Sequence, residues 1–240
     1  MKNFLQRQYL SCLLLLLIGI SHPSAQTQER YSVSGVVLDA ETGKPLPSAN
    51  VFFANTMMGS VTDSTGRFLI RNVPVGTFEL VVSRVGYEVA KREIQISGEL
   101  VIDPAFKLRP IVLSAAEVEV TAPYPKKWKT HLEQFSDLLL STTKNAAKAK
   151  ILNSHVLEFH EEKDDQFVVT ALEPLLIENW ALGYKLNFVL VEFRASSQKL
   201  QYKGSIKFDE LAPSSEKQAE EWRKNRLRTY QGSLRHFLAT

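Results

Sequence analysis

The chain has 240 residues and an ordinary globular composition, with 44% hydrophobic and 23% charged residues. This composition excludes a protein that is disordered over most of its length. The formal net charge is only +3 and the two signs are intermixed, so the chain lacks the basic character typical of nucleic-acid-binding proteins. We therefore expect no nucleic-acid partner.

Residues 1–25 have the layout of a secretory signal peptide. Lys2 and Arg7 precede an uninterrupted apolar stretch, and small residues follow up to Ala25. The apolar stretch is about half as long as a membrane-spanning helix requires, so a retained anchor is the lesser alternative. We expect cleavage after Ala25, although Pro23 leaves the exact bond open. The remaining chain would be exported, without a transmembrane segment, to the periplasm or the outer membrane, where it could associate peripherally.

Export also fixes the cysteine chemistry. The single cysteine, Cys12, lies inside the apolar stretch and leaves with the signal peptide. The mature chain would then have no disulfide, thiol nucleophile or thiolate metal site. Because residues 1–25 contain no acidic residue, losing Lys2 and Arg7 leaves a net charge of about +1. About 215 residues remain, enough for one large or two small domains.

Residues 26–112 predict an all-β unit. Short segments of alternating apolar and polar residues are separated by turn clusters, and no helical period extends beyond one turn. The segment Asp63–Gly66 predicts a hairpin connection, because it starts with aspartate and ends with glycine. Gly86 and Tyr87 indicate a second bend or hairpin. Seven strands are expected, at residues 31–39, 49–54, 59–62, 67–72, 77–85, 88–96 and 101–108.

The same region resembles a known family. The resemblance rests on Gly35–Asp39, Thr42, Gly43, Pro45–Pro47, Ala49–Val51, Thr62, Asp63, Gly66–Phe68, Val73, Pro74, Gly76 and Val85–Tyr87. These residues are similar to the carboxypeptidase-regulatory-like domain, a prealbumin-type (transthyretin-like, immunoglobulin-like) β-sandwich. In Gram-negative bacteria of the Bacteroidota type, such domains stand at the front of outer-membrane nutrient receptors. The resemblance implies no peptidase activity, because the zinc ligands and catalytic glutamate of carboxypeptidases belong to a separate domain.

Residues 113–125 are expected to form an extended segment and a proline-rich linker. Glu117–Thr121 resembles the acidic, Val-x-Val-Thr segment that contacts TonB in those receptors. The alternative is a final edge strand that runs into the linker. Pro123 and Pro125 exclude a helix before them, so the domain boundary is placed there. The plug and barrel of a working receptor do not follow, so we expect no transport.

Residues 126–240 predict an α+β domain in the order helix, antiparallel sheet, helix. The first helix is indicated by an apolar stripe at Trp128, Leu132, Phe135 and Leu139. Strands are expected at residues 153–160, 166–172, 175–179, 184–195 and 199–208. The longest of them, 184–195, is apolar on both faces over its middle, which favours a central position.

The last helix is predicted to start at a capping box formed by Ser215 and Gln218. Gly232 weakens it locally, and the sequence contains no stop signal after it, so we expect a truncated C-terminus. The inward positions are expected at Ala219, Trp222, Leu227, Tyr230, Leu234 and Phe237. Basic residues on the solvated face are expected at Arg223, Lys224, Arg226, Arg228 and Arg235.

This second half also resembles an uncharacterised companion region of exported proteins that carry the same sandwich. That region implies no activity. The residues that carry the resemblance are Phe135, Leu138, Leu139, Thr143, Asn145, Ala146, Ile151–Asn153, Glu173–Leu175, Asn179, Leu182–Tyr184, Tyr202–Gly204, Phe208, Trp222, Asn225, Arg226, Gly232, Ser233 and His236–Leu238.

We find no constellation that predicts catalytic, cofactor-binding or metal-binding residues, and we expect no enzyme. His155 and His160 are an odd number apart on one predicted strand and should face opposite ways. The run from His160 to Asp165 is a solvated hairpin tip rather than a calcium loop, because it lacks the glycine and ligand spacing of such loops. Ser233 and His236 share a helix face but lack an orienting acid and an oxyanion hole. Asp39 and Asp63 are interpreted as turn formers.

Other mixed clusters are also interpreted as structural. Residues 124–129 combine aromatic and basic side chains as interfacial membrane segments do. A linker followed by a helix whose Trp128 points inward is the interpretation we favour. The arginines and lysines of the last helix are likewise interpreted as a solvated helix face, and a polyanion-binding site is the lesser alternative.

Two classes of function stay open. The first is a non-catalytic binding or structural module of the cell envelope with a protein or glycan partner. The second is a hydrolase whose active site lies between the domains or in a missing C-terminal part. A cluster of exposed aromatic side chains would favour glycan binding. A cavity that holds His155 or His160 beside a carboxyl with a perturbed pKa would favour the enzyme.

Overall fold

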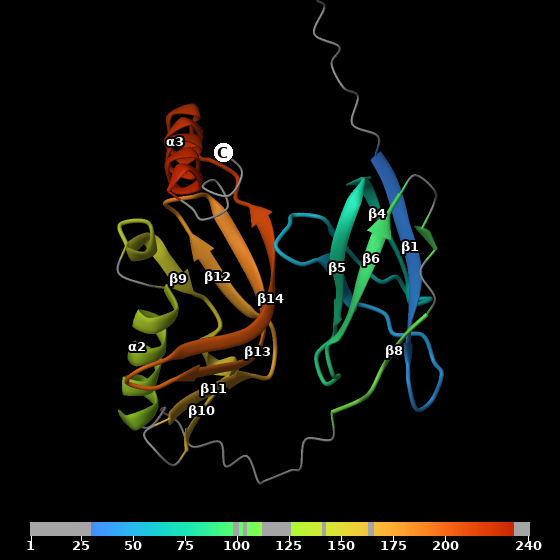
Figure 1. The fold of residues 1–240 in the computed structure, drawn as a ribbon, viewed down its shortest axis with the longest axis horizontal. Helices are drawn as coiled ribbons and strands as arrows, with labels where there is room; N and C mark the ends of the chain where they lie inside the picture. Colours follow the sequence, from blue (N-terminus) through green and yellow to red (C-terminus); the bar gives the residue numbers. More distant parts are fainter. Residues whose placement is uncertain are drawn as a thin grey trace, which may run out of the picture.

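The computed structural model describes residues 30–97, 101–102, 105–111, 126–140, 143–162 and 166–232. The predicted signal peptide, the Val-x-Val-Thr segment, the proline-rich linker and residues 233–240 lie outside this part. The described residues stack in layers: the two sheets of a sandwich, a third sheet facing it, and helix α2 on the far side of that sheet (Figure 1).

The first sheet of the sandwich is built around β1 (Arg30–Asp39). Strand β4 (Arg67–Pro74) pairs with it antiparallel. On its other edge, β7 (Val101–Ile102) and β8 (Phe106–Leu108) pair with it in parallel, one after the other. The predicted single strand over 101–108 is therefore two short strands.

The second sheet of the sandwich has the order β3-β2-β5-β6, formed by β3 (Gly59–Val61), β2 (Asn50–Phe53), β5 (Gly76–Ser83) and β6 (Ala90–Ile96). All pairs are antiparallel, and β5 and β6 form the hairpin expected around Gly86. Side chains from both sheets fill one core, whose buried members include Val33, Val37, Phe53, Phe68, Ile70, Leu80 and Val82. The predicted β-sandwich is confirmed.

The turn at Asp63–Gly66 corrects one prediction. Its local chemistry is as expected, because the Asp63 carboxylate accepts hydrogen bonds from the backbone N–H groups of Thr65 and Arg67 at 2.8 and 3.0 Å. However, β3 before the turn pairs in one sheet and β4 after it pairs in the other. The predicted hairpin is wrong: the turn carries the chain from one sheet to the other.

The second domain contains a six-stranded sheet with β13 (Tyr184–Ala195) at its centre, as predicted. One edge of β13 pairs first with β12 (Leu175–Asn179) and then with β11 (Gln166–Ala171). The other edge pairs along its whole length with β14 (Leu200–Glu210). Beyond these lie β10 (Leu157–Glu162), which pairs with β11, and β9 (Ala149–Ile151), a strand that was not predicted.

One face of this sheet is covered by α2 (Lys126–Leu140). The predicted apolar stripe packs as expected: Phe135 is fully buried and lies 5.1 Å, ring to ring, from Phe193. Trp128 packs edge-on against Phe159, so it points inward. The opposite face of the sheet is turned toward the sandwich (Figure 1).

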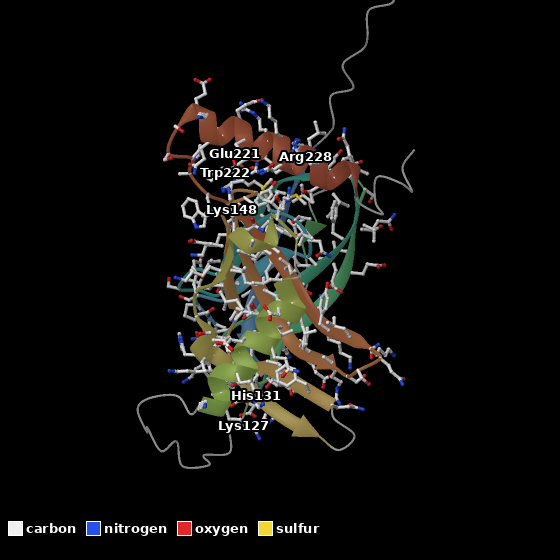
Figure 2. The ribbon with its side chains drawn as sticks, turned by 90° about the vertical axis from the view of Figure 1, so that its left-hand side faces the viewer. Lys127, His131, Lys148, Glu221, Trp222 and Arg228 are labelled. Atoms are coloured by element: carbon white, nitrogen blue, oxygen red, sulfur yellow. The ribbon has the colours of Figure 1, made fainter. Side chains whose placement is uncertain are left out.

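The last helix, α3 (Glu216–Gln231), lies across one end of the sheet (Figure 2). Its start is the expected capping box, since the Ser215 hydroxyl accepts a hydrogen bond from the Gln218 N–H at 3.2 Å. Its inward face differs from the prediction: Leu227 is 57% exposed and Tyr230 is exposed as well. Asn225 and Arg226 take inward positions instead. Neither described helix is long and apolar enough to cross a membrane.

Candidate binding site at the junction of the two domains

The sandwich and the second domain are joined by backbone hydrogen bonds. The loop after β2 runs along the free edge of β14 and extends the six-stranded sheet. The Asn55 N–H donates to the Ile206 carbonyl at 2.7 Å, and the Phe208 N–H donates to the Thr56 carbonyl at 2.9 Å. Asn55 adopts the left-handed conformation, with φ of 60°, that turns the loop onto this edge. Together these bonds fix the loop to β14.

A small apolar cluster lies between the domains. Phe52 and Val81, on the outer face of the second sandwich sheet, pack against Val189 of β13 and are almost fully buried. The outer face of a sandwich sheet usually meets water, so these two side chains are buried only because the second domain covers them. Each buried side chain of this size contributes roughly 1.5–3 kcal/mol relative to an exposed one.

A polar cluster also joins the domains. The Lys91 ammonium donates to the Ser205 hydroxyl at 2.7 Å, and this hydroxyl donates to the Glu79 carboxylate at 3.0 Å. Lys91 and Glu79 also form an ion pair at 3.4 Å. Lys91 and Glu79 are partly exposed, so the ion pair contributes little by itself, and its main effect is to fix the register between β5, β6 and β14.

Helix α3 is anchored on the loop between β12 and β13. The Trp222 indole N–H donates to the Trp180 carbonyl at 2.8 Å, and the Asn225 amide donates to the Ala181 carbonyl at 2.9 Å. Lys148 and Glu221, labelled beside Trp222 in Figure 2, add an exposed ion pair at 3.6 Å. The loop and helix residues that carry the resemblance to the companion region are therefore brought together in space.

Arg226 completes this anchor, although it was predicted on the solvated face. Its guanidinium donates to the carbonyls of Leu182 and Gly183 at 2.6 and 3.0 Å and pairs with Glu210 at 2.6 Å. It also lies 4.0 Å above the ring of Tyr184. The planar fork of arginine suits such simultaneous contacts, so Arg226 holds α3 against the sheet.

An open apolar groove of about 720 Å³ lies between α3, β14 and the loop that joins the domains. Met57 is 55% exposed at its rim, and Tyr230 is exposed on the opposite side. The groove is lined by Asn55–Met58, Leu182, Tyr184, Phe208, Arg226, Thr229 and Tyr230. We call it the junction groove. Both domains contribute to it, so neither domain could form it alone.

A second, polar cavity of about 290 Å³ lies between β2 and β5 of the sandwich and β13 and β14. The Ser83 hydroxyl at its boundary is buried, and none of the described residues forms a hydrogen bond with it. Within the described residues, no basic side chain is hydrogen-bonded to this hydroxyl.

His155 and His160 were predicted to lie on one strand, and the structure places them in different elements. His155 lies in a short 3-10 turn, Ser154–Val156, and His160 lies in β10, so the two are not on one strand. Both are exposed, and neither lines the groove or the polar cavity. His131, which carried no prediction, lies on α2 (Figure 2), and its ring packs against the stacked pair formed by Phe159 and Phe167.

Several further predictions concern residues outside the described part. Ser233, Leu234, His236 and Phe237 are among residues 233–240, and the centre of the acidic hairpin tip falls at 163–165. The hairpin itself is present, because β10 pairs with β11 up to Glu162 and Gln166. Among the described residues, no group of three or more histidine, aspartate or glutamate side chains is placed to hold a metal ion.

Asp39 is a turn former, as interpreted. Its carboxylate accepts hydrogen bonds from the backbone N–H groups of Thr42 and Glu41 at 2.8 and 2.9 Å and from the Tyr87 hydroxyl at 2.8 Å. These bonds, the one from Thr42 first, lower the pKa of Asp39 to about 2. The hydrogen bond between Asp39 and Tyr87 in turn raises the pKa of the Tyr87 hydroxyl. This carboxyl therefore ties the β1 turn to the bend between β5 and β6.

The two sheets packed around one core define the first domain as a β-sandwich of the immunoglobulin-like fold class. Residues 33–120 match the family model of the CarboxypepD_reg-like domain. This match confirms, for residues 33–120, the resemblance seen in the sequence.

A curated relative places this domain in a larger context. The TonB-dependent receptor P39 of Formosa agariphila is 36% identical over 94 residues, which are 39% of this chain. The matched region spans only 9% of the receptor's length. The similarity is thus to one part of a much larger protein.

Solved structures resemble parts of the fold. A cohesin–X-dockerin complex from Acetivibrio cellulolyticus matches with a TM-score of 0.28 and 22% identity, over 33% of this chain and 58% of that one. The C-terminal domain of shaft pilin SpaA from Lactobacillus rhamnosus GG matches with 0.29 and 15%, over 35% and 100%. Catechol 1,2-dioxygenase from Acinetobacter sp. ADP1 matches with 0.29 and 14%, over 38% and 55%. Similarity at this level carries no information on ligands or activity.

Proposed function

We propose that this protein is a non-catalytic binding module of the cell envelope, in the periplasm or at the outer membrane, and that it holds a protein partner in the junction groove. The observation that carries this proposal is the exposed apolar lining of the groove, with Met57 more than half exposed. Exposed apolar surface gathered in one concave place is typical of interaction sites.

The groove favours a protein partner over a glycan. Met57 and Met58 are flexible, polarisable side chains that adapt to varied apolar partners. In the part of the chain that the structure describes, the exposed aromatic side chains are spread out: Tyr230 lines the groove, Tyr202 lies on β14 away from it, and Trp180 packs on Trp222. A glycan platform would instead need such rings side by side. We expect an extended or helical peptide segment with apolar anchors.

The location in the envelope rests on two further observations. Residues 1–25 predict a signal peptide, and the sandwich is similar to a segment of a TonB-dependent receptor. The match to the CarboxypepD_reg-like domain also favours a role without catalysis, because the catalytic residues of carboxypeptidases belong to a separate domain.

The test is recovery of the partner from cell envelopes with matched variants. Tagged wild-type protein, Met57→Asp and Val75→Asp would be crosslinked in cells, fractionated and purified. Val75 is as exposed as Met57, at 54%, but lies in the turn between β4 and β5, outside the groove. We expect the wild type and Val75→Asp to recover the same envelope protein and Met57→Asp to lose it at least tenfold, since a buried unpaired charge is strongly unfavourable at an interface.

Two results would contradict the proposal. One is recovery of the tagged protein only from the cytosol. The other is a partner that both aspartate variants retain equally, or a bound glycan in place of a protein, because neither would need the apolar lining of the groove.

A further inference from the structure

The polar cavity between the domains has a different chemistry from the groove. Its volume of about 290 Å³ is near the lower end of the roughly 300–1,000 Å³ typical of small-ligand pockets. The side chains that give it hydrogen-bonding capacity come from both domains: Asn50 and Ser83 from the sandwich, and Lys185, Asn187, Lys207 and Asp209 from the second domain.

The acidic side chain that lines the cavity, Asp209, already has partners within the cavity. The Asp209 carboxylate accepts a hydrogen bond from the Asn187 amide at 2.8 Å through one oxygen and pairs with the Lys207 ammonium through the other. Lys207 and Asp209 are only partly exposed. One lysine of the cavity is therefore neutralised by an acidic partner within the cavity itself.

The other lysine that lines the cavity is Lys185. Within the described residues its ammonium forms no ion pair and no side-chain hydrogen bond, although it is only half-exposed. Glu178 lies directly across the ladder on β12, but its carboxylate accepts a hydrogen bond from the Trp180 indole N–H at 3.1 Å and does not reach Lys185. The cavity thus holds one unpaired positive charge.

The remaining polar groups of the cavity also favour a ligand that carries hydrogen-bond acceptors. Ser83 lies at the boundary of the cavity with a buried hydroxyl that no side chain or backbone group of the described residues satisfies, an arrangement that is rare and unfavourable in folded proteins. The ammonium groups of Lys185 and Lys207 can only donate hydrogen bonds. A ligand that fits here must bring acceptor oxygens and negative charge.

We propose that this cavity binds a small organic carboxylate, about the size of an acidic monosaccharide or an acidic amino acid. The carboxylate pairs with Lys185, and the polar remainder of the ligand lies toward Asn50 and Asn187. Phe52 and Val189 supply an apolar wall. This site is independent of the junction groove and of the partner proposed for it.

Ligand binding at this place would also stabilise the docking of the domains. A ligand that contacts both walls binds only when the two domains are together, so it shifts the equilibrium toward the docked state and raises the melting temperature. The melting temperature is thus a readout of binding that needs no knowledge of a biological partner.

The experiment measures melting temperature and calorimetric affinity of the purified protein with defined probes. Glucuronate and glutamate test the two sources of a carboxylate, glucose is the uncharged match of glucuronate, and inorganic phosphate tests a general anion. Concentrations up to about ten millimolar cover the weak end of small-ligand affinity. We expect glucuronate or glutamate to raise the melting temperature, and glucose and phosphate to leave it unchanged.

Matched variants locate the site. Lys185→Gln should weaken carboxylate binding at least about tenfold, because it removes a charge-assisted hydrogen bond, and Lys185→Arg should retain part of it. Lys203→Gln is the control, since Lys203 lies on β14 with its side chain 78% exposed and outside the cavity. Lys185 has no partner to lose, so its replacement should leave the fold and the melting temperature of the unliganded protein intact.

Several outcomes would overturn the proposal. Equal effects of glucose and glucuronate would remove the role of charge, and an equal effect of phosphate would remove the preference for a carboxylate. An equal loss in Lys203→Gln would indicate unspecific attraction. Absence of any shift with both carboxylates would exclude the site itself.

Discussion

Gly183 and Trp222 are in direct contact, and the contact leaves no room for a side chain at position 183. A methyl group on Gly183 would come within 2.2 Å of the Trp222 ring. Gly183 also has a positive φ of 66°, a conformation that favours glycine. The loop between β12 and β13 and the helix α3 therefore fit together only because residue 183 is a glycine.

Replacing Gly183 by alanine should destabilise the protein. Overpacking costs about 1–3 kcal/mol and the left-handed backbone adds about 1 kcal/mol for a residue with a Cβ. Gly43→Ala is the matched control, because Gly43 has nearly the same φ, 68°, but nothing within 4 Å of the new methyl group. Urea unfolding should show a clearly larger loss for Gly183→Ala. Equal losses would mean that the contact with Trp222 is not tight.

Arg226 should be needed as an arginine. Arg226→Lys keeps the charge but cannot reach the two carbonyls, Glu210 and the Tyr184 ring at once, so we expect a loss of about 1.5–3 kcal/mol in unfolding free energy. Arg223→Lys is the control, because Arg223 lies three residues earlier on α3 and pairs with Glu220 at the surface. Its effect on the unfolding free energy should stay within about 0.5 kcal/mol. Similar effects of the two substitutions would contradict the anchoring role.

Phe52 and Phe53 are neighbours in β2 and should have separable roles. Phe53 lies in the sandwich core, whereas Phe52 packs only in the cluster between the domains. Phe52→Ala should speed hydrogen exchange at the Asn55 and Phe208 amides, which donate across the junction, while amides within the sandwich stay protected.

Phe53→Ala should instead lower the stability of the whole sandwich by about 3–5 kcal/mol, as is usual for a large core residue. The comparison is made by hydrogen exchange monitored by NMR or mass spectrometry. If Phe52→Ala left exchange at the junction amides unchanged, the apolar cluster would not be what holds the domains together.

Asp39 gives a pH dependence with a defined sign. Its pKa is lowered to about 2, mainly by the Thr42 N–H and then by the Tyr87 hydroxyl. A depressed pKa means that the ionised carboxyl stabilises the fold above its unfolded value near 4, and that this contribution is lost as the pH falls through about 2. Tyr87→Phe should raise the pKa of Asp39 part of the way to its ordinary value.

The titration is followed by NMR of the carboxyl carbons. Asp63 is the internal control, because its pKa is lowered by hydrogen bonds from Thr65 and Arg67 and not by Tyr87. A Tyr87→Phe variant in which the pKa of Asp39 stays the same, or in which Asp63 shifts equally, would contradict the hydrogen-bond cause.

Much of the fold could be predicted from local sequence, and the exceptions have physical reasons. The central position of β13 follows from its apolar residues on both faces. The same signal is present in Phe52–Phe53 of β2 and in Leu80–Val82 of β5, where both faces are also buried, and it could have predicted that the sandwich is covered on its outer side. Asp63 correctly predicts a turn, but contacts with distant strands decide which strands pair. The prediction that the strands on either side of this turn form a hairpin was therefore wrong.

The junction was harder to predict because its polar residues act through long-range contacts. Helical periodicity placed Leu227 inward and Arg226 outward, and the structure places them the other way round. The carbonyls that receive Arg226 come from a loop more than forty residues away. Amphipathic pattern alone cannot identify such a buried arginine.

Site-specific photocrosslinking in cell envelopes shows directly whether the junction groove binds an envelope protein. A photoreactive amino acid would replace Met57 in the junction groove or, as the control, Val75 in the turn between β4 and β5. We expect a discrete crosslinked envelope protein from position 57 and none from position 75. The absence of any adduct at position 57, or the same adduct from both positions, would contradict binding in the junction groove.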